Sequence, residues 1–395
     1  MGNTSTVRCP VSQSERLSVF FELPQVPVLI NVLYGTAEDA RGVTRGDIQL
    51  TFCEDSGHIF NQSFDLSLLD YSLEYDNSLH FSARFREYAD ALARELVEVY
   101  DLHGKTMVEV GCGKGDFLRL LCRLGNNEGV GYDPSLNLDA DLQRAAAEDG
   151  VRYVRGYYNP DAAPKQTDFV CCQHTLEHIE DPRPFLEGIR DSVHGNRDTV
   201  FYFEVPNALW TLRDMAVWDV IYEHCGYYTP TSLRLLFESC GFEALDVRER
   251  FGGQYLSICA RIAKNPATSD SAAARAELSD YVAAFKAAYA EKVGHFSSQL
   301  RQLESDGKSA AIWGAGSKGI TFLNILGNSS ALEFAVDLNP AKHGQFVAGT
   351  GHEIVPPEHL RQNPVDVILV MNPIYTDEIR SMVGELGLEP EFWAL

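Results

Sequence analysis

The segment Val-Glu-Val-Gly-Cys-Gly-Lys-Gly-Asp-Phe-Leu (108–118) constrains the fold of this chain more than any other. An apolar run leads into Gly111, Gly113 and Gly115, and a helical pattern follows. Glycines at such a turn let the backbone bend sharply and approach a ligand closely. The following helix points free N–H groups at a carboxylate or phosphate. The next apolar run ends at Asp133, and an acid at that place can accept both hydroxyls of a ribose.

Short apolar runs alternate with helical patterns after this turn, which is typical of a parallel α/β sheet. In the middle of the chain the runs cover 106–110, 129–133, 167–172 and 199–205. A polar linker follows Ala263, and apolar residues at helical spacing then predict a long helix that ends near Gly307. Beyond this helix a second α/β pattern has its runs at 309–314, 333–337 and 366–372.

The first 75 residues have a different pattern. Turn residues separate the runs 27–34, 47–53 and 58–64, which predicts a small β-rich lobe. We therefore expect four parts: the β-rich lobe at 1–75, an α/β core with a leading helix at 76–262, a linker and long helix at 263–307, and a second α/β lobe at 308–395.

The chain has 395 residues, with 33 Lys and Arg against 56 Asp and Glu and a formal net charge of −23. A surface this acidic repels phosphate backbones and anionic lipid, so we expect neither nucleic acid nor a membrane as a partner. No stretch approaches the roughly 20 apolar residues of a membrane helix, and we see no signal peptide. The nine Cys are unevenly spaced, which is typical of reduced thiols in a cytoplasmic protein.

A candidate catalytic cluster follows the run at 199–205. Tyr222, Glu223 and His224 are consecutive, and adjacent residues do not face one another on a helix, so convergence requires an irregular loop. A His can take a proton near neutral pH, a Glu can orient it, and a Tyr hydroxyl can hydrogen-bond an oxyanion. The alternative is a capped helix start with a solvated carboxylate.

Two further histidines, His174 and His178, lie four residues apart. On a helix they would share a face, which allows a metal pair. No third ligand or HExxH pattern accompanies them, so we expect no metal here. A contact with substrate or a hydrogen-bonded histidine in the core is the interpretation we favour.

A second glycine turn, Gly-Ala-Gly-Ser-Lys-Gly (314–319), has the spacing of a dinucleotide fingerprint. It keeps a nucleotide-binding oxidoreductase open as an alternative. Only about 80 residues remain from this turn to the last residue, too few for a full six-strand NAD domain. The turn also carries Lys318, a cation suited to a phosphate.

The first turn, E-x-G-x-G-x-G, resembles motif I of class I S-adenosylmethionine (SAM) methyltransferases. Asp133 matches the ribose-binding acid of that family, and residues 173–178, Gln-His-Thr-Leu-Glu-His, match the segment after its fourth strand. The resemblance covers 104–262 and implies a central Rossmann-like sheet that binds SAM. The residues it assigns to the cofactor are Glu109, Gly111, Cys112, Gly113, Gly115, Asp133, Gln173 and His174, with Tyr157 as a candidate for stacking on the purine.

The stretches IYEHCGYYTPTSL (221–233) and GFEALDVRERFGGQYLSI (241–258) resemble the substrate region of the NDP-sugar C-methyltransferase family. This resemblance implies that His224 is the base, that Tyr222 and Glu223 lie by the sugar, and that His178 is a second site histidine. Residues 308–395 resemble the C-terminal Rossmann-like lobe of the same family. Substrate contacts are then expected from Tyr71, Tyr75, Asn207, Gly316, Ser317 and Lys318.

That family begins with a zinc-binding domain that has two paired cysteine motifs. The corresponding pairs here are Cys9 with Ser12 and Cys53 with Ser56, so each pair has lost its second Cys. A serine hydroxyl is a poor zinc ligand, and His58 would bring the set to three at best. We expect that zinc is not bound.

These resemblances imply a SAM-dependent methyltransferase that acts on a small-molecule acceptor. The function we expect is C-methylation of a nucleotide-linked ketosugar or a related metabolite through a base-generated enolate, as in deoxysugar and natural-product biosynthesis. The alternatives are O- or N-methylation of a natural-product or sugar acceptor, and the oxidoreductase activity named above.

Overall fold

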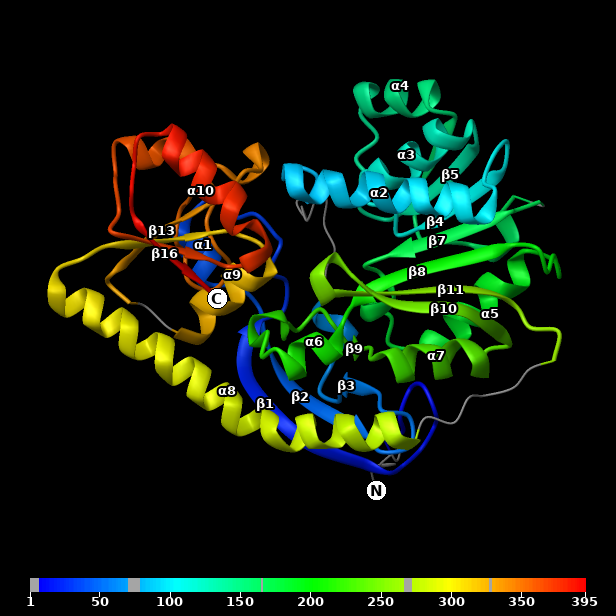
Figure 1. The fold of residues 1–395 in the computed structure, drawn as a ribbon, viewed down its shortest axis with the longest axis horizontal. Coiled ribbons are helices and arrows are strands. Elements are labelled where there is room, and N and C mark those ends of the chain that lie inside the picture. The colour runs from blue at the N-terminus through cyan, green and yellow to red at the C-terminus, as the bar shows by residue number, and fades with distance from the viewer. Residues whose placement is uncertain (1–6, 70–78, 165, 266–271, 327–328) are drawn as a thin grey trace.

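The computed structural model describes residues 7–69, 79–164, 166–265, 272–326 and 329–395. These residues form three sheets, of four, seven and five strands, which lie side by side in Figure 1. The seven-stranded sheet belongs to the core, the five-stranded sheet to the C-terminal lobe, and the four-stranded sheet to the N-terminal lobe. None of the described helices has both the length and the apolarity needed to cross a membrane.

The central sheet has the strand order β10-β11-β8-β7-β4-β5-β6. The five strands β4 (Thr106–Val110), β5 (Glu128–Asp133), β6 (Val151–Arg155), β7 (Phe169–Gln173) and β8 (Val200–Pro206) are parallel. The hairpin β10 (Phe242–Arg250) and β11 (Tyr255–Ile262) completes the sheet, with β11 antiparallel to β8. The predicted parallel runs are confirmed, whereas the antiparallel edge was not predicted.

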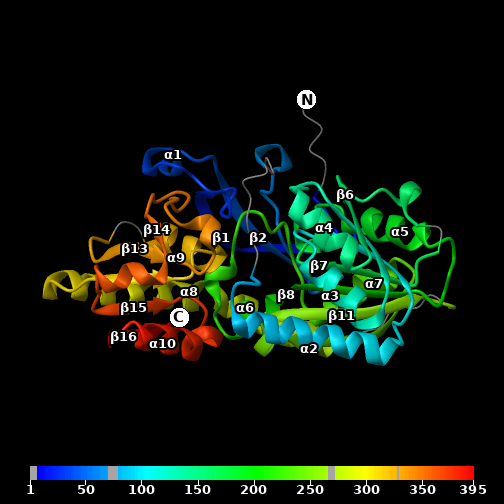
Figure 2. The ribbon, with the colours of Figure 1, turned by 90° about the horizontal axis from the view of Figure 1, so that it is seen from above.

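Helices cover both faces of this sheet (Figures 1 and 2). Alternate strand residues point to opposite faces, so each face has its own apolar cluster. One cluster includes α2 (Ala83–Tyr100), α3 (Asp116–Gly125) and a residue of α4 (Ala140–Glu148). The other includes α5 (Pro182–Ser192) and α7 (Pro230–Ser239). A sheet covered on both faces leaves its carboxyl edge as the place where a ligand can bind.

The N-terminal lobe is a sheet of β1 (Leu17–Pro27), β2 (Arg45–Cys53), β3 (Ile59–Asn61) and β9 (Gly226–Tyr227), with α1 (Ala37–Arg41) beside it. The strand predicted at 27–34 is wrong, because β1 ends at Pro27 and mostly loop follows. Two register shifts against β2, one of them between Leu23 and Val26, accommodate the Pro-containing strand that the pattern did not reveal.

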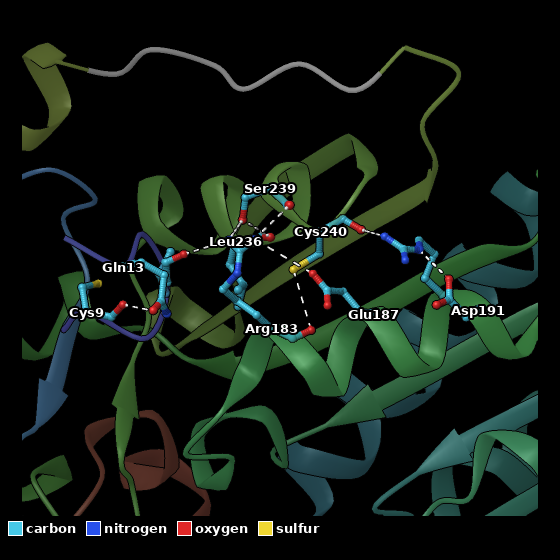
Figure 3. Close-up of polar contacts among 10 residues, drawn as sticks. Cys9, Gln13, Arg183, Glu187, Asp191, Leu236, Ser239 and Cys240 are labelled. Atoms are coloured by element: carbon cyan, nitrogen blue, oxygen red, sulfur yellow. Dashed lines mark hydrogen bonds and ion pairs between the residues drawn. The ribbon is translucent and has the colours of Figure 1, made fainter. Parts of the chain in front are cut away.

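The N-terminal lobe is joined to the core by backbone and side-chain contacts. Strand β9 comes from the segment after His224 and pairs with β3. The turn at 9–14 is held by Arg183 of α5, whose Nη1 donates to the carbonyl of Val11 at 3.1 Å and to Ser239 Oγ at 2.8 Å. Figure 3 shows Arg183 between this turn and α7. The lobe is therefore positioned by the core rather than attached through a linker alone.

The long predicted helix is α8 (Ala272–Asp306), which ends directly before Gly307. Phe285 on α8 makes edge-to-face contacts with Phe20 and Phe21 of β1. The C-terminal sheet follows, with the order β14 (Ile354–Val355), β13 (Leu332–Val336), β12 (Ala310–Trp313), β15 (Val367–Val370) and β16 (Glu391–Ala394), all parallel. The helices α9 (Ser317–Leu326) and α10 (Thr376–Glu385) belong to this lobe, and α6 (Ala208–Arg213) follows β8.

Both glycine turns lie at topological switch points. Strand β4 lies between β5 and β7, and strand β12 lies between β13 and β15, so in each sheet the strand order reverses at the strand before the turn. In open α/β sheets, ligands bind outside the carboxyl ends of the strands at such points. The fold thus provides two candidate binding places.

The close packing of α9 on β12 gives a stability test. A Cβ at Gly319 would lie 2.0 Å from the carbonyl oxygen of Gly314, whereas a Cβ at Gly316 would meet nothing within 4 Å. Overpacking of a filled site costs about 1–3 kcal/mol. We expect Gly319→Ala to lower the free energy of unfolding by about that amount. The matched variant Gly316→Ala should unfold like the wild type in denaturant titrations, and equal effects of the two would contradict the packing described.

Candidate active site

One pocket is lined from both the central and the C-terminal sheet. His174 and Pro206 line it from the carboxyl ends of β7 and β8. Gly314, Asp337 and Asn372 line it from the carboxyl ends of β12, β13 and β15. The carboxyl edges of the two parallel sheets therefore open onto the same space.

A pair of amides joins the two walls of this pocket. Gln254 Nε2 donates to Asn372 Oδ1 at 2.9 Å, and Asn372 Nδ2 donates back to Gln254 Oε1 at 2.8 Å. Glu378 of α10 makes a second connection, accepting from Ser82 Oγ at 2.7 Å and from the amide of Ala83 at 2.8 Å. These contacts hold the C-terminal lobe against the core at the pocket.

The first glycine turn has the tight geometry that its residues predict. Gly111, Gly113 and Gly115 all have positive φ. A Cβ on Gly111 would lie 2.0 Å from Thr175 Oγ1, so only glycine fits there. The amide of Gly113 donates to Asp133 Oδ2 at 2.8 Å, which fixes the carboxylate at the turn. The turn and the tip of β5 therefore lie together as expected.

Glu109 and Cys112 are buried beside this turn rather than open to a ligand. The Glu109 carboxylate accepts from the backbone of Leu118 in α3, and burial raises its pKa well above the usual value. Its Oε2 has no hydrogen-bond partner among the described residues. Glu109 thus contacts the first turn of α3, and its contact with the cofactor stays a prediction. Cys112 Sγ contacts the carbonyl of Gly113.

The other residues assigned to the cofactor are spread along the same edge. Gln173 ends β7, and His174 follows it with a φ of 51°. Tyr157 is 79% exposed in the loop after β6, so its stacking on a purine stays a prediction.

His174 is held by two buried carboxylates that the sequence analysis did not single out. Its Nε2 lies 3.3 Å from Glu204 Oε1, and its Nδ1 lies 3.8 Å from Glu177 Oε1. Burial opposes protonation, but the nearby carboxylates of Glu204 and Glu177 raise the pKa of His174. Glu204 also accepts from the hydroxyls of Tyr88 and Tyr202. A Glu inside a buried strand run is the signal that would have pointed to it, as for Glu109.

His178 and His224 form a pair in the pocket. Their ring centroids lie 5.0 Å apart and the rings meet edge to face. Nδ1 of His178 lies 2.9 Å from the backbone carbonyl of Glu223. Burial lowers the pKa of His178 to about 4 and lowers that of His224 well below its usual value. Burial also raises the pKa of the adjacent Glu177 to about 7.

Tyr222 and Glu223 point away from this pair and do not line the pocket. The hydroxyl of Tyr222 accepts from the backbone amide of Asp65 at 2.9 Å, and its ring stacks on Phe64. Glu223 is fully buried, and its Oε2 accepts from the amide of Ile30 at 3.4 Å. The adjacent positions diverge as the chain leaves the core for the N-terminal lobe, and the roles of Tyr222 and Glu223 beside the sugar stay predictions.

The predicted substrate contacts are placed in different surroundings. Asn207 is buried as the N-cap of α6, where it accepts from the amide of Leu209 and donates to the carbonyl of Gly253. Tyr71 and Tyr75 lie outside the described residues. Gly316, Ser317 and Lys318 line the pocket, and their contact with a substrate phosphate stays a prediction.

The second glycine turn presents a cation that is already paired. Lys318 Nζ lies 2.6 Å from Asp219 Oδ1. Asp337, at the tip of β13, accepts from the amide of Ala315 at 2.9 Å. The buried Lys342 donates to the carbonyl of Ala315 at 2.8 Å. Asp219 and Lys342 were not predicted; an acid opposite a pocket lysine becomes apparent only once the two lobes are placed together.

The cysteine pairs of the N-terminal lobe also come together. Cys9 Sγ lies 3.3 Å from Ser56 Oγ, and Cys53 Sγ lies 3.4 Å from Ser12 Oγ. His58 packs against Tyr228 instead. In the described part of the chain, the group of His, Cys, Asp and Glu close enough to share a metal ion is Glu177, His178 and His224, and it does not include Cys9 or Cys53.

Comparisons with known families match two consecutive parts of the chain. Residues 80–247 match a family described as "Methyltransferase domain", and residues 263–387 match one described as "C-methyltransferase C-terminal domain". The second glycine turn lies within the latter match, so the comparisons give no support to the oxidoreductase alternative.

Individual relatives agree with these matches. The chain is 27% identical over 293 residues to the C-methyltransferase NovU of Streptomyces niveus, covering 70% of this chain and 68% of NovU. It is 31% identical over 98 residues to the mitochondrial ubiquinone biosynthesis O-methyltransferase of Schizosaccharomyces pombe, covering 24% of this chain and 35% of that one.

A solved structure, the magnesium protoporphyrin IX methyltransferase of Synechocystis with bound SAH, is 15% identical to this chain with a TM-score of 0.38. The match covers 48% of this chain and 91% of that one.

The two domain matches and the NovU relative lead to one assignment. The chain is a SAM-dependent methyltransferase in which a methyltransferase domain is followed by a C-methyltransferase C-terminal domain.

Proposed function

We propose that this enzyme methylates a carbon atom of a nucleotide-linked ketosugar or a chemically related metabolite. The proposal rests on one pocket that is lined both by the pair His178 and His224 and by the second glycine turn with Lys318. The histidines supply proton chemistry at one wall, and the turn supplies a cation at the other. A sugar with an anionic nucleotide tail requires both.

SAM fits the first glycine turn on the chemistry of the residues present. The cradle excludes side chains at Gly111, and the carboxylate of Asp133 lies at the tip of the neighbouring strand. Gly111, Gly113 and Asp133 would hold the cofactor. When bound, SAM supplies a methyl group on a positively charged sulfur, which is already activated for transfer.

The protein's own contribution to the reaction is the removal of a carbon-bound proton from the acceptor. His224 would accept the proton next to the ketone of the acceptor, and the electron pair of the C–H bond would pass into the enolate. His178, oriented by the backbone carbonyl of Glu223, would hold an acceptor oxygen. The walls formed by both lobes would align the reacting carbon and exclude water.

O-methylation is the second candidate, since ubiquinone O-methyltransferases are among the relatives. The C-methyltransferase C-terminal domain favours carbon as the acceptor atom. An oxygen nucleophile needs little help from a base, so the dependence on His224 separates the two functions.

The base assignment is tested by His224→Ala. We expect turnover with SAM and a nucleotide-linked 4-ketosugar to fall by about 10²–10⁴-fold, the usual contribution of a general base. Exchange of the acceptor's carbon-bound hydrogen with solvent deuterium should fall in parallel. His103→Ala, a change at an exposed histidine, serves as the control. Normal turnover in His224→Ala would refute the enolate mechanism.

The cofactor assignment is tested by Asp133→Asn, which keeps the shape of the side chain and removes its charge. A hydrogen bond to a charged group contributes about 1.5–3 kcal/mol, so the Kd of SAH should rise about 10- to 100-fold. Calorimetry measures this directly, with Asp141→Asn on α4 as the surface control. Unchanged SAH binding in Asp133→Asn would show that the ribose is held elsewhere.

The ion pair of Lys318 with Asp219 gives opposite expectations for its two members. Lys318→Ala should raise the KM for a nucleotide-linked acceptor, because the cation at the turn is lost. Asp219→Asn should lower that KM, because the lysine is released from its partner and an acid leaves the anion site. Steady-state kinetics at saturating SAM measures both. Two shifts in the same direction would contradict an anion site at this turn.

A further inference from the structure

Three side chains from two separate segments converge on the central-sheet wall of the pocket. Glu177 and His178 belong to the short 3-10 turn Leu176–His178 after β7, and His224 belongs to the loop before β9. One ligand atom from each lies within 4.8 Å of the others. The sequence alone reveals no third ligand for the pair His174 and His178. The fold brings His224 and the carboxylate of Glu177 to His178, and His174 is not part of this group.

The Glu177 carboxylate has an oxygen that the protein leaves unsatisfied. Glu177 is 2% exposed, and its Oε2 has no hydrogen-bond partner among the described residues. The other oxygen, Oε1, faces His174 at 3.8 Å. A buried carboxylate oxygen without a partner is costly, and a bound water, ligand or ion, or a catalytic role, accounts for such an atom in a native structure.

The orientation of His178 is the one found in metal sites. Its Nδ1 lies 2.9 Å from the carbonyl of Glu223, and the tautomer that donates this hydrogen bond has its lone pair on Nε2. Metal-ligating histidines nearly always donate their second ring N–H to a backbone carbonyl or carboxylate, which fixes the ring. This contact is independent of the unsatisfied oxygen of Glu177.

We propose that Glu177, His178 and His224 bind a divalent transition-metal cation, with Zn²⁺ as the occupant of this class. Two imidazoles and one carboxylate with an open fourth position form a known zinc ligand set. Nitrogen ligands favour Zn²⁺ over Mg²⁺ or Ca²⁺, which prefer oxygen alone. Ligand atoms in a tetrahedral site are about 3.3 Å apart, given zinc bonds of about 2.0–2.1 Å. A side-chain adjustment of roughly 1 Å therefore closes the site.

The charges around the site are compatible with a cation. Lys318, which also lines the pocket, forms an ion pair with Asp219 at 2.6 Å. His174 lies between Glu177 and Glu204, two buried acids against one imidazole. A bound cation would supply the positive charge that this wall lacks.

The consequence for catalysis rests on the proposed function. A cation on the ring nitrogen of His224 removes the lone pair that would accept the proton of the acceptor. The metal and the carbon-acid reaction therefore exclude one another, and micromolar Zn²⁺ should inhibit the enzyme, with activity restored by a chelator.

Binding is tested on the full chain with Co²⁺, whose visible bands report coordination without any need for activity. We expect one Co²⁺ per chain with the band intensity of a four-coordinate site. Glu177→Gln and His178→Ala should each weaken binding at least tenfold. Glu180→Gln, a change at an exposed carboxylate just after the turn, should leave binding unchanged. The double variant Cys9→Ser, Cys53→Ser should bind Co²⁺ like the wild type, and the spectra of both proteins should lack a thiolate-to-cobalt band.

A measurement on the wild type covers the case in which a variant fails to fold. Electron paramagnetic resonance of the Cu²⁺-loaded protein should show coupling to two imidazole nitrogens. No binding up to millimolar metal, binding unaffected by Glu177→Gln in a folded variant, or a spectrum without nitrogen coupling would overturn the site. Metal binding without inhibition would keep the site and contradict the base role of His224. If the wild type binds no metal and His224→Ala is inactive, the metal site is refuted and the base role of His224 stands.

Discussion

The structure depends on one geometric constraint: two parallel sheets from different lobes turn their carboxyl edges toward the same pocket. A sheet covered by helices on both faces can receive a ligand only at this edge, and most readily where the strand order reverses. Strands β4 and β12 mark that point in the central and C-terminal sheets. In the function that we propose, the donor lies at the first turn and the anionic acceptor lies in the pocket lined by the second turn and the histidine pair.

Buried carboxylates accompany this edge. Glu109 supports the first turn through α3, and Glu204 holds His174 together with Tyr88 and Tyr202. Each costs desolvation that its partners must offset. Glu204 and Glu177 position His174, which lines the pocket.

Much of this arrangement could be predicted from sequence, because it depends on local patterns. The apolar run 106–110 forms β4. Gly111, Gly113 and Gly115 have the positive φ values that the turn requires, and Asp133 accepts a hydrogen bond from Gly113. The helix before Gly307 also ends where its spacing indicates. Periodicity and turn chemistry decide such features within a few residues of chain.

The rest depended on tertiary contacts that no local pattern contains. Tyr222 and Glu223 adjoin His224 in sequence, yet they pack into the N-terminal lobe against Asp65 and Ile30. The carboxylate that does accompany His224 is Glu177, from another segment. The strand β1 was missed because it contains prolines and pairs with β2 through two register shifts, neither of which an alternating pattern reveals.

We propose that donor and acceptor bind next to one another between the core and the C-terminal lobe. The most direct measurement is a crystal structure of the enzyme with SAH and a nucleoside diphosphate bound together. The account predicts SAH at the turn after β4 and the diphosphate at the turn after β12, with the histidine pair in the space between them. A nucleotide bound outside this pocket, or a dinucleotide extended along Gly314–Gly319 with no SAH at the first turn, would contradict it.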